Sequence, residues 1–541
     1  MGENFEDEEI KEEGLSFLTI PVIIAGLAIL ICAFIFLKIT MGRLDEAETA
    51  AAGAKTDAEA AEGSVLPEML LTRVNESWYR RLGDEQPSAA SYYGRIGLNE
   101  RSEAVYPALA EALESYSEEN AAYMKAIQEA NCKYVAAGGP NCEEELVYSP
   151  KRADEKVFSF SVRYREDGSA GFREGISGAA FDSQTGKRLA FGDVAVRRQD
   201  FCDRAAARLF EAYGEEEFDF DSTRKLSDYL FENILLEDMN DLFTVDPLGV
   251  TVYLPAGIAA AEEKGVHMVS VFFSESPKMF AENVRGTSDT YVMLLDKAPY
   301  VNFIDVEGDG EPETITVEGL SYEPGDPEEG LYPYAGVALG LNGDANRQYF
   351  GCDSFEAAAV KNGTSTYLYV SVSAEGKNEL LVYEVTGGKV VFTQKQEDVY
   401  FLAEPGDDAE EEWLFSCDSN NIALVSTMNA LGSYKGTHSC HVGKNGAPAA
   451  NTDWYMCEDD RWLTARKELR ALALDQTTLE PTGKEIIVPA GAYMTFYRTD
   501  NAEYVDFFAG NTTYIRFAYG AAHPQSVNGE TAAEVFEGIE Y

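Results

Sequence analysis

The densest group of potential metal ligands in this sequence is the acidic run from Asp305 to Glu313, DVEGDGEPE. Its carboxylates recur at short intervals, and Gly308 permits a tight turn between them. Ca²⁺ binds about six to eight oxygen atoms, many of them from carboxylates, so the residue types fit its chemistry. The run therefore predicts a calcium site with four acidic ligands, Asp305, Glu307, Asp309 and Glu313. The alternative is an acidic turn that binds no ion.

A second cluster, His438-Ser439-Cys440-His441, carries side chains that zinc prefers. On a strand, His438 and Cys440 would share one face of the sheet, whereas His441 would lie on the other. A tetrahedral zinc site would therefore need Cys417 or Cys457 to converge from elsewhere in the chain.

Disulfides are the alternative use of the eight cysteines. Cys440 could pair with Cys457, and Cys132 could pair with Cys142 across a short loop that contains Gly and Pro. In the loop-entropy model the shorter cross-link would stabilise the fold by roughly 2.5 to 3 kcal/mol. This cysteine content is compatible with an oxidising compartment.

Ser222 and Lys225 match the Ser-x-x-Lys pattern that opens the motif set of penicillin-binding enzymes, but the companion motifs Ser-Asp-Asn and Lys-Thr-Gly are absent. Ser222 precedes a predicted helix that ends near Leu235, so we interpret it as a helix N-cap.

The sequence lacks a phosphate-binding Gly loop, a nucleophile elbow and a His-Glu-x-x-His motif, and it contains 4 histidines in all. It therefore predicts a protein that is not an enzyme. A carboxylate pair for glycoside hydrolysis stays open, because 94 acidic residues make many pairings feasible.

Acidic residues outnumber Lys and Arg by 94 to 43, which gives a formal net charge of −51. Such a charge repels nucleic acid and anionic lipid headgroups. It favours cationic partners, either divalent metals or basic proteins, although acidity also serves solubility alone.

An uncharged apolar stretch, residues 15–37, is long enough to cross a hydrocarbon core of about 30 Å as a helix. We predict that it is a transmembrane helix whose partner is the lipid bilayer. Residues 1–14 form a short acidic tail, and residues 38–84, rich in Ala and acids, form a stalk. We expect a single-pass protein of the cell membrane whose large C-terminal body is extracytoplasmic.

Residues 85–280 read as an α+β domain. Pro107 suits the first position of a helix, after which Leu109, Leu113 and Tyr116 recur at helical spacing. Alternating residues from Val157 to Tyr164 predict a strand, and two further helices are expected near residues 201–213 and 223–235.

The order of these elements resembles an extracytoplasmic domain of Gram-positive bacteria, shared by the lysozyme-sensing anti-sigma factor RsiV and the peptidoglycan deacetylase PdaC. The resemblance covers about residues 104–274, through motifs such as VFSFSVRY, FDSQTGKRLAFGDV and VHMVSVFF. It implies an extracellular sensing or binding role, with a cationic protein such as lysozyme as a ligand. The family usually has Gly-Ala-His after the first strand, whereas this chain has no histidine there, and the paired histidines of a zinc deacetylase are missing.

Residues 281–460 predict a β-rich, propeller-like or sandwich-like domain that contains the acidic turn at Asp305, which resembles the loops of FG-GAP repeats. Gly387-Gly388 is a good hairpin turn, and the acidic run 407–412 is expected to be an exposed loop. Residues 461–541 predict a small β-barrel, which resembles the SH3-like terminal modules of clostridial surface proteins.

Together these features predict a multidomain, membrane-anchored, non-catalytic protein of the cell envelope that binds or senses an extracellular ligand. The alternatives are an envelope glycan hydrolase with an unidentified carboxylate pair and a passive surface scaffold.

Overall fold

The computed structural model describes residues 66–79, 88–286, 289–309, 313–322, 331–401, 410–457, 461–510 and 513–539. They belong to one compact unit, Val65–Tyr541. The predicted acidic tail, transmembrane helix and first part of the stalk lie outside the described residues. Within the described ranges, none of the helices combines the length and apolar character that a membrane span requires.

The first sheet has the strand order β19-β1-β2-β3-β4-β5. Its strands are β1 (Met69–Trp78), β2 (Ala89–Leu98), β3 (Cys142–Ala153), β4 (Val157–Gly168), β5 (Gly171–Asp182) and β19 (Glu410–Phe415). β2 and β3 are parallel and the other neighbours are antiparallel. The parallel pair requires a long crossover, which contains α2 (Glu100–Val105) and α3 (Pro107–Ala136).

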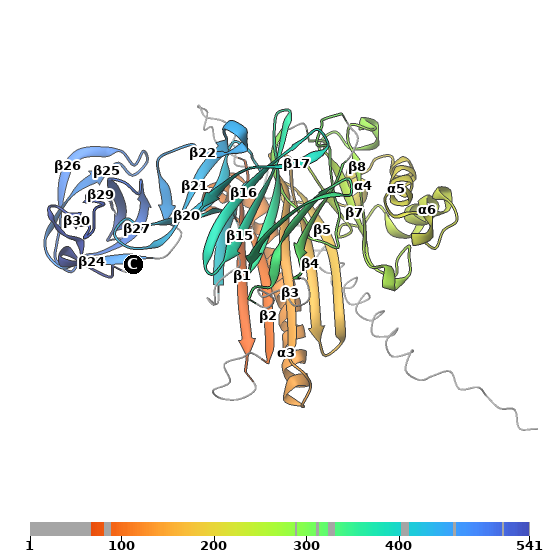
Figure 1. The fold of residues 1–541 in the computed structure, drawn as a ribbon, viewed down its shortest axis with the longest axis horizontal. Helices are drawn as coiled ribbons and strands as arrows, with labels where there is room; N and C mark the ends of the chain where they lie inside the picture. The colour runs from red at the N-terminus through yellow and green to blue at the C-terminus, as the bar shows by residue number, and fades with distance from the viewer. Residues whose placement is uncertain are drawn as a thin grey trace, which may run out of the picture. The chain divides into compact units, whose positions relative to one another are not determined.

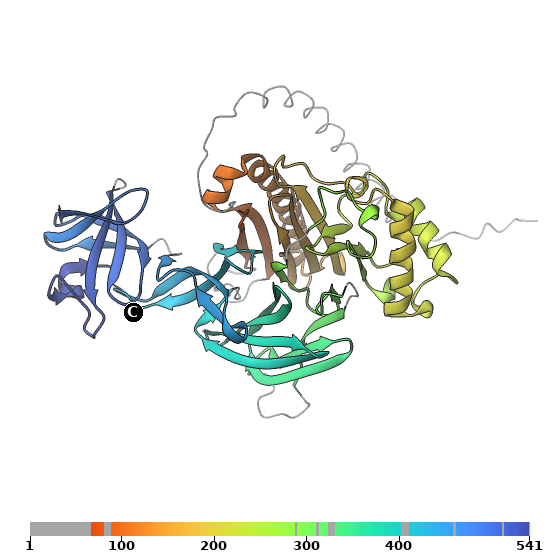
Figure 2. The same ribbon diagram turned by 90° about the horizontal axis from the view of Figure 1, so that it is seen from above.

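Helix α3 packs along one face of this sheet (Figures 1 and 2). It begins at Pro107, as the sequence predicts, and buries Leu109 and Leu113 completely. The ring of Tyr116 meets the edge of Phe160 on β4, with ring centres 5.4 Å apart. The predicted helix and the predicted strand therefore form one aromatic core.

Two features of the first sheet correct the sequence analysis. β1 lies inside residues 38–84, which were predicted to be stalk, because its alternate residues Met69 and Leu71 are buried in the core. The acidic run 407–412 was predicted to be an exposed loop, but residues from Glu410 onward form β19 and pair with β1. β19 thereby supplies the hydrogen bonds that the open edge of β1 would otherwise lack.

A helical layer follows β5 in the chain. It consists of α4 (Phe191–Val194), α5 (Arg198–Tyr213), α6 (Thr223–Tyr229) and a π-helical turn (Leu230–Ile234), which pack with the small sheet β6 (Phe243–Val245), β7 (Gly249–Leu254) and β8 (His267–Phe272). Both helices predicted for this region are present. Ser222 caps α6 by accepting a hydrogen bond from the Lys225 amide, which confirms its interpretation as an N-cap.

Two antiparallel sheets make up much of the β-rich segment. One contains β10 (Asn302–Ile304), β11 (Glu313–Leu320), β12 (Tyr334–Leu341) and β13 (Asp344–Cys352); the other contains β9 (Thr290–Leu294), β14 (Ser354–Asn362), β15 (Ser365–Ala374), β16 (Lys377–Thr386) and β17 (Lys389–Glu397). Gly387 and Gly388 join β16 to β17 with φ values of 56° and 70°, as the hairpin prediction requires.

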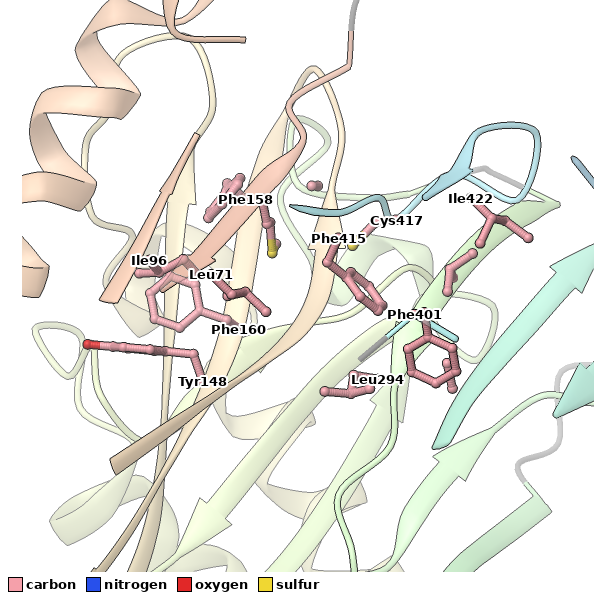
Figure 3. Close-up of a cluster of buried hydrophobic side chains, with 14 of the residues drawn as sticks. Leu71, Ile96, Tyr148, Phe158, Phe160, Leu294, Phe401, Phe415, Cys417 and Ile422 are labelled. Carbon is pink, nitrogen blue, oxygen red and sulfur yellow. The ribbon is translucent and has the colours of Figure 1, made fainter. Parts of the chain in front are cut away.

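One hydrophobic core joins the first sheet to the sheet that contains β9. Figure 3 shows Phe158 and Phe160 from the first sheet in the same cluster as Leu294, Phe401 and Phe415. The segments predicted to form two separate domains therefore share a core, because apolar faces of both sheets are buried against each other.

The remaining strands form a 14-stranded sheet assembly. It contains β18 (Val399–Tyr400), β20 (Ile422–Met428), β21 (Tyr434–Val442), β22 (Pro448–Ala450), β23 (Tyr455–Cys457), β24 (Trp462–Ala465), β25 (Leu469–Leu474), β26 (Pro481–Val488), β27 (Tyr493–Thr499), β28 (Tyr504–Ala509), β29 (Thr513–Gly520), β30 (Ser526–Val527), β31 (Glu530–Thr531) and β32 (Phe536–Glu537), with α7 (Ala532–Val535) before the last strand. The described chain is thus built from several sheets and is rich in β structure, which confirms the coarse fold class.

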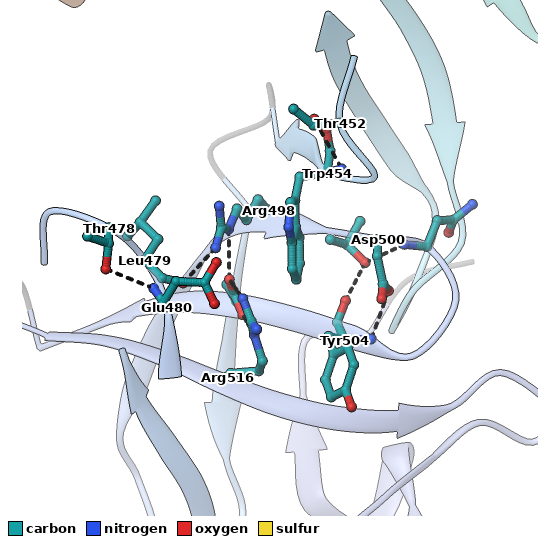
Figure 4. A network of polar contacts seen from close by, with 12 residues as sticks. Thr452, Trp454, Thr478, Leu479, Glu480, Arg498, Asp500, Tyr504 and Arg516 are labelled. Atoms are coloured by element: carbon teal, nitrogen blue, oxygen red, sulfur yellow. Dashed lines mark hydrogen bonds and ion pairs between the residues drawn. The ribbon is translucent and has the colours of Figure 1, made fainter. Parts of the chain in front are cut away.

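A buried ionic cluster reinforces this assembly (Figure 4). Asp506 on β28 has no exposed surface and accepts hydrogen bonds from Arg498 at 2.8 Å and from Arg516 at 2.6 and 2.8 Å. The ring of Trp454 lies 4.2 Å from the guanidinium carbon of Arg498 and 4.4 Å from that of Arg516.

No disulfide joins the described cysteines, from Cys132 to Cys457, so both predicted disulfides are corrected. Cys457 is opposite Gly436 in the β21–β23 register, four residues along β21 from Cys440. Four residues of a strand span about 13 Å, whereas a disulfide requires Cα atoms within about 7 Å.

Candidate ligand-binding cavity

A cavity of about 90 Å³ lies between the first sheet and the segment that follows β9. The sheet contributes Leu71, Arg73, Val147, Arg163 and Trp413 to its walls, and the second segment contributes residues from Leu294 to Tyr300. The side chain of Tyr148 on β3 faces α3 and contacts Tyr116. Because side chains alternate along a strand, Val147 lies on the opposite face, so the cavity and α3 are on different sides of the sheet.

Strand register places the cavity walls side by side. Leu71 of β1 is directly opposite Trp413 of β19, and Arg73 follows Leu71 on the same face. Arg163 enters from β4, two strands beyond β2. Residues that are hundreds of positions apart in the sequence thus surround one small volume.

A buried ion pair fixes the segment that closes the cavity. The Lys151 ammonium group donates to the Asp296 carboxylate and to the Leu294 carbonyl oxygen, both at 2.8 Å. The side chains of Lys151 and Asp296 are only 3% and 5% exposed. Ser161 of β4 donates to the other carboxylate oxygen of Asp296 at 3.1 Å. Both strands β3 and β4 are therefore tied to the residues after β9.

The cationic side chains of the cavity differ in how well they are neutralised. Lys297 forms a 2.7 Å ion pair with Glu356. Arg73 and Arg163 instead share Glu145, at 3.7 and 3.9 Å respectively. Both distances exceed the usual range for a hydrogen bond between N–H and oxygen. The two guanidinium groups therefore keep donor capacity that Glu145 does not use.

Tyr300 supplies a neutral polar group at the end of the cavity. Its hydroxyl donates to Glu174 at 3.4 Å, and its side chain is almost completely buried. Burial, followed by the neighbouring Glu174 carboxylate, raises the pKa of Tyr300. The hydroxyl thus stays protonated across the physiological range.

The acids predicted to bind calcium lie around the turn between β10 and β11. Asp305 accepts hydrogen bonds from the amides of Gly308 at 2.6 Å and Asp309 at 3.1 Å. Glu313 accepts from the Val306 amide at 2.7 Å, while Glu307 and Asp309 are exposed. Residues 310–312 lie outside the described ranges.

No group of three or more His, Cys, Asp or Glu side chains is arranged to hold a metal ion in the described part of the chain. The nearest buried cation to the turn, Lys361, donates to the Val306 carbonyl oxygen at 2.8 Å. Calcium binding by Asp305, Glu307, Asp309 and Glu313 stays a prediction.

The His438-Cys440-His441 cluster is divided between two faces of β21, as the sequence predicts. His438 is 9% exposed, and its ring centre lies 4.4 Å from that of Tyr455. Burial lowers the pKa of His438. His441 is exposed and makes a 2.7 Å hydrogen bond with Asn451. The described side chains around it form no zinc site.

Sequence reasoning missed a pair of buried carboxylates on the α3 side of the first sheet. Glu144 of β3 is directly opposite Glu166 of β4, and the residues are 1% and 3% exposed. Asn131 of α3 donates to Glu144 at 2.5 Å, and Tyr164 donates to Glu166 at 2.6 Å. Burial, reinforced by Glu166, raises the pKa of Glu144 to about 7.

The cavity residues were also missed. Arg73 falls in the predicted stalk and Trp413 beside the predicted acidic loop, so neither carried a functional signal. The alternation of MLLTRV, residues 69–74, is the one signal that could have placed Arg73 on a strand.

Part of the chain is similar to solved structures. No family model matches the chain, and no curated protein matches it. Among solved structures, the chain is similar to a DUF3298 family member from Bacteroides fragilis, with 13% identity and a TM-score of 0.28, over 40% of this chain and 94% of that one. A DUF3298 family protein from Pseudomonas aeruginosa gives 12% identity and a TM-score of 0.27, over 42% and 99%.

Proposed function

We propose that this chain is a membrane-anchored, non-catalytic protein of the cell envelope that binds or senses an extracellular ligand. The observation that supports this proposal is the cavity between the first sheet and the segment after β9. Its position between two structural layers, held in place by the buried Lys151 and Asp296 pair, is typical of ligand sites.

The location of the protein is part of this proposal. Residues 15–37 would cross the membrane once, and the residues that follow would face the outside of the cell. The resemblance of residues 104–274 to the RsiV and PdaC domain supports this orientation. Within the same proposal, residues 281–460 form a propeller-like or sandwich-like domain. Residues 461–541 form an SH3-like barrel.

A cationic envelope protein, such as lysozyme, would be a second kind of partner. The net charge of −51 supports this assignment, because long-range attraction accelerates the capture of a basic protein. Binding of the full chain to lysozyme should weaken steeply as NaCl rises from low to physiological concentration. Absence of any salt-sensitive binding to lysozyme and other basic envelope proteins would exclude this partner class.

The ligand-binding role is tested by thermal unfolding of the full chain in a panel of small carboxylates, amines and sugars. A ligand that binds the folded state alone raises the melting temperature, and the rise grows with the ratio of ligand concentration to Kd. We expect at least one compound to raise the melting temperature of the unaltered chain but not that of Val147→Trp, because the larger indole ring fills the cavity. Val391→Trp, on the exposed surface of β17, is the matched control. A panel without any stabilising compound would contradict the proposal.

The hydrolase alternative would need a carboxylate pair that substrate can reach. Glu144, whose pKa is raised, lies opposite Glu166, but the exposure of these residues, 1% and 3%, leaves no room for a glycan. Release of sugar from cell-wall glycan by the full chain, abolished by Glu166→Gln, would favour the hydrolase. The passive scaffold would be favoured if neither ligand binding nor hydrolysis occurs.

A further inference from the structure

The cationic side chains around the cavity differ in the length of their ion pairs. Lys151 is paired with Asp296, and Lys297 is paired with Glu356. Arg73 and Arg163 share longer ion pairs with Glu145, at 3.7 and 3.9 Å, and the charges of Glu356 and Asp296 also act on Arg163. The two guanidinium groups are therefore less tightly held by carboxylates than the two ammonium groups.

Arg73 has unused hydrogen-bonding capacity at this site. Its Nε–H group is buried and has no hydrogen-bond partner among the described residues. Its guanidinium carbon lies 5.2 Å from the ring centre of Tyr92, which holds the plane of the group. A planar guanidinium with free donors matches the two oxygens of a carboxylate.

The lining also includes apolar and aromatic side chains. Leu71, Val147, Leu294 and Trp413 contribute carbon atoms to the walls. A cavity of about 150 Å³ is large enough for benzene, so the 90 Å³ available here suits a shorter carbon chain.

From these observations we propose that the cavity binds the carboxylate group of a small organic monoanion. Arg73 and Arg163 hold the carboxylate, and a chain of two or three carbons lies against Val147 and Trp413. This inference rests on the proposed function, since it names the ligand class of the same cavity.

Calorimetric titration of the full chain with propionate tests the inference. Propionamide, which has the same shape without the charge, and propylammonium, which has the opposite charge, are the comparison probes. We expect propionate to bind at least 10-fold more tightly than either probe. Arg73→Met and Arg163→Met should each weaken propionate binding by 10-fold or more, whereas Arg73→Lys should retain part of it.

Arg165→Met is the matched control, because Arg165 is exposed and lies two residues beyond Arg163 on the same face of β4. It should change the affinity by less than twofold. Equal binding of propionate and propionamide to the unaltered chain would overturn the inference, even if an arginine variant failed to fold. Equally tight binding of inorganic phosphate would also overturn it, since the site would then select charge rather than a carboxylate.

The two proposals can fail separately. If propionate does not bind but an amine or a sugar stabilises the unaltered chain and not Val147→Trp, the cavity is a ligand site of another class. If no compound acts through the cavity, the proposed function itself fails.

Discussion

Glu144 and Glu166 are directly opposite each other on β3 and β4, and both carboxylates are buried beneath α3. One oxygen of Glu144 has no hydrogen-bond partner among the described residues. Burial, with a smaller contribution from the neighbouring Glu166 carboxylate, raises the pKa of Glu144 to about 7. Glu144 is therefore a source of pH-dependent stability.

Stability should fall as the pH rises from about 4.5 to about 7. In this window Glu144 ionises in the unfolded chain but stays protonated in the folded chain, so the folded state binds more protons. The free energy of unfolding falls by at most about 3 kcal/mol, and this fall is complete once the pH exceeds the pKa of Glu144 in the folded chain. Urea unfolding of the full chain at a series of pH values measures it.

Glu144→Gln should flatten this pH dependence, because the neutral amide replaces the protonated acid. The variant should be more stable than the unaltered chain at pH 8, by up to about 3 kcal/mol, and about equally stable at pH 4. Glu143→Gln, on the exposed neighbouring residue, is the control and should leave the profile unchanged. An unchanged profile for Glu144→Gln would show that Glu144 is not the titrating group.

Lys151→Met should destabilise the described unit by about 3 to 5 kcal/mol, since it leaves the buried Asp296 carboxylate without a counter-charge. Adding Asp296→Asn should recover part of this loss, because the uncompensated charge is then removed. Lys156→Met, at an exposed position, should change the free energy of unfolding by less than about 0.5 kcal/mol. Additive effects of the two buried substitutions would contradict a direct interaction.

Asp506→Asn should loosen the strands around the ionic cluster of Figure 4. It removes the negative charge that Arg498 and Arg516 share, which should lower the local free energy of opening by about 3 to 5 kcal/mol. Amide hydrogen exchange of β27, β28 and β29 measures this local opening. Arg470→Met, which alters an exposed ion pair on β25, is the control and should leave exchange in these strands unchanged.

The calcium prediction is decided by calorimetric titration of the full chain with Ca²⁺. Binding heat at millimolar concentration or below, lost in Asp305→Asn, would support a site at the turn. The structure favours weak binding at most, because Asp305 and Glu313 already accept hydrogen bonds from backbone amides of the turn. Asp344→Asn, on β13 of the same sheet, is the control.

Local patterns predicted the elements that depend on neighbouring residues. Pro107 begins α3, Ser222 caps α6, and Gly387-Gly388 turns between β16 and β17, because capping and turn geometry are set within a few residues. The alternation of apolar or aromatic residues with small or polar ones over positions 157–164 predicted β4, because this pattern too is set by residues close together in the sequence.

The sequence by itself determined the charge of the chain, its β-rich character and many of its helix and strand positions, since these depend on composition and on short-range periodicity. Only the tertiary structure decided that β19 completes the first sheet and that Arg73, Arg163 and Trp413 surround one cavity. It likewise decided that Glu144 is opposite Glu166. Such relationships depend on strand order and register between distant segments, which are selected by burial of the whole core rather than by any local pattern.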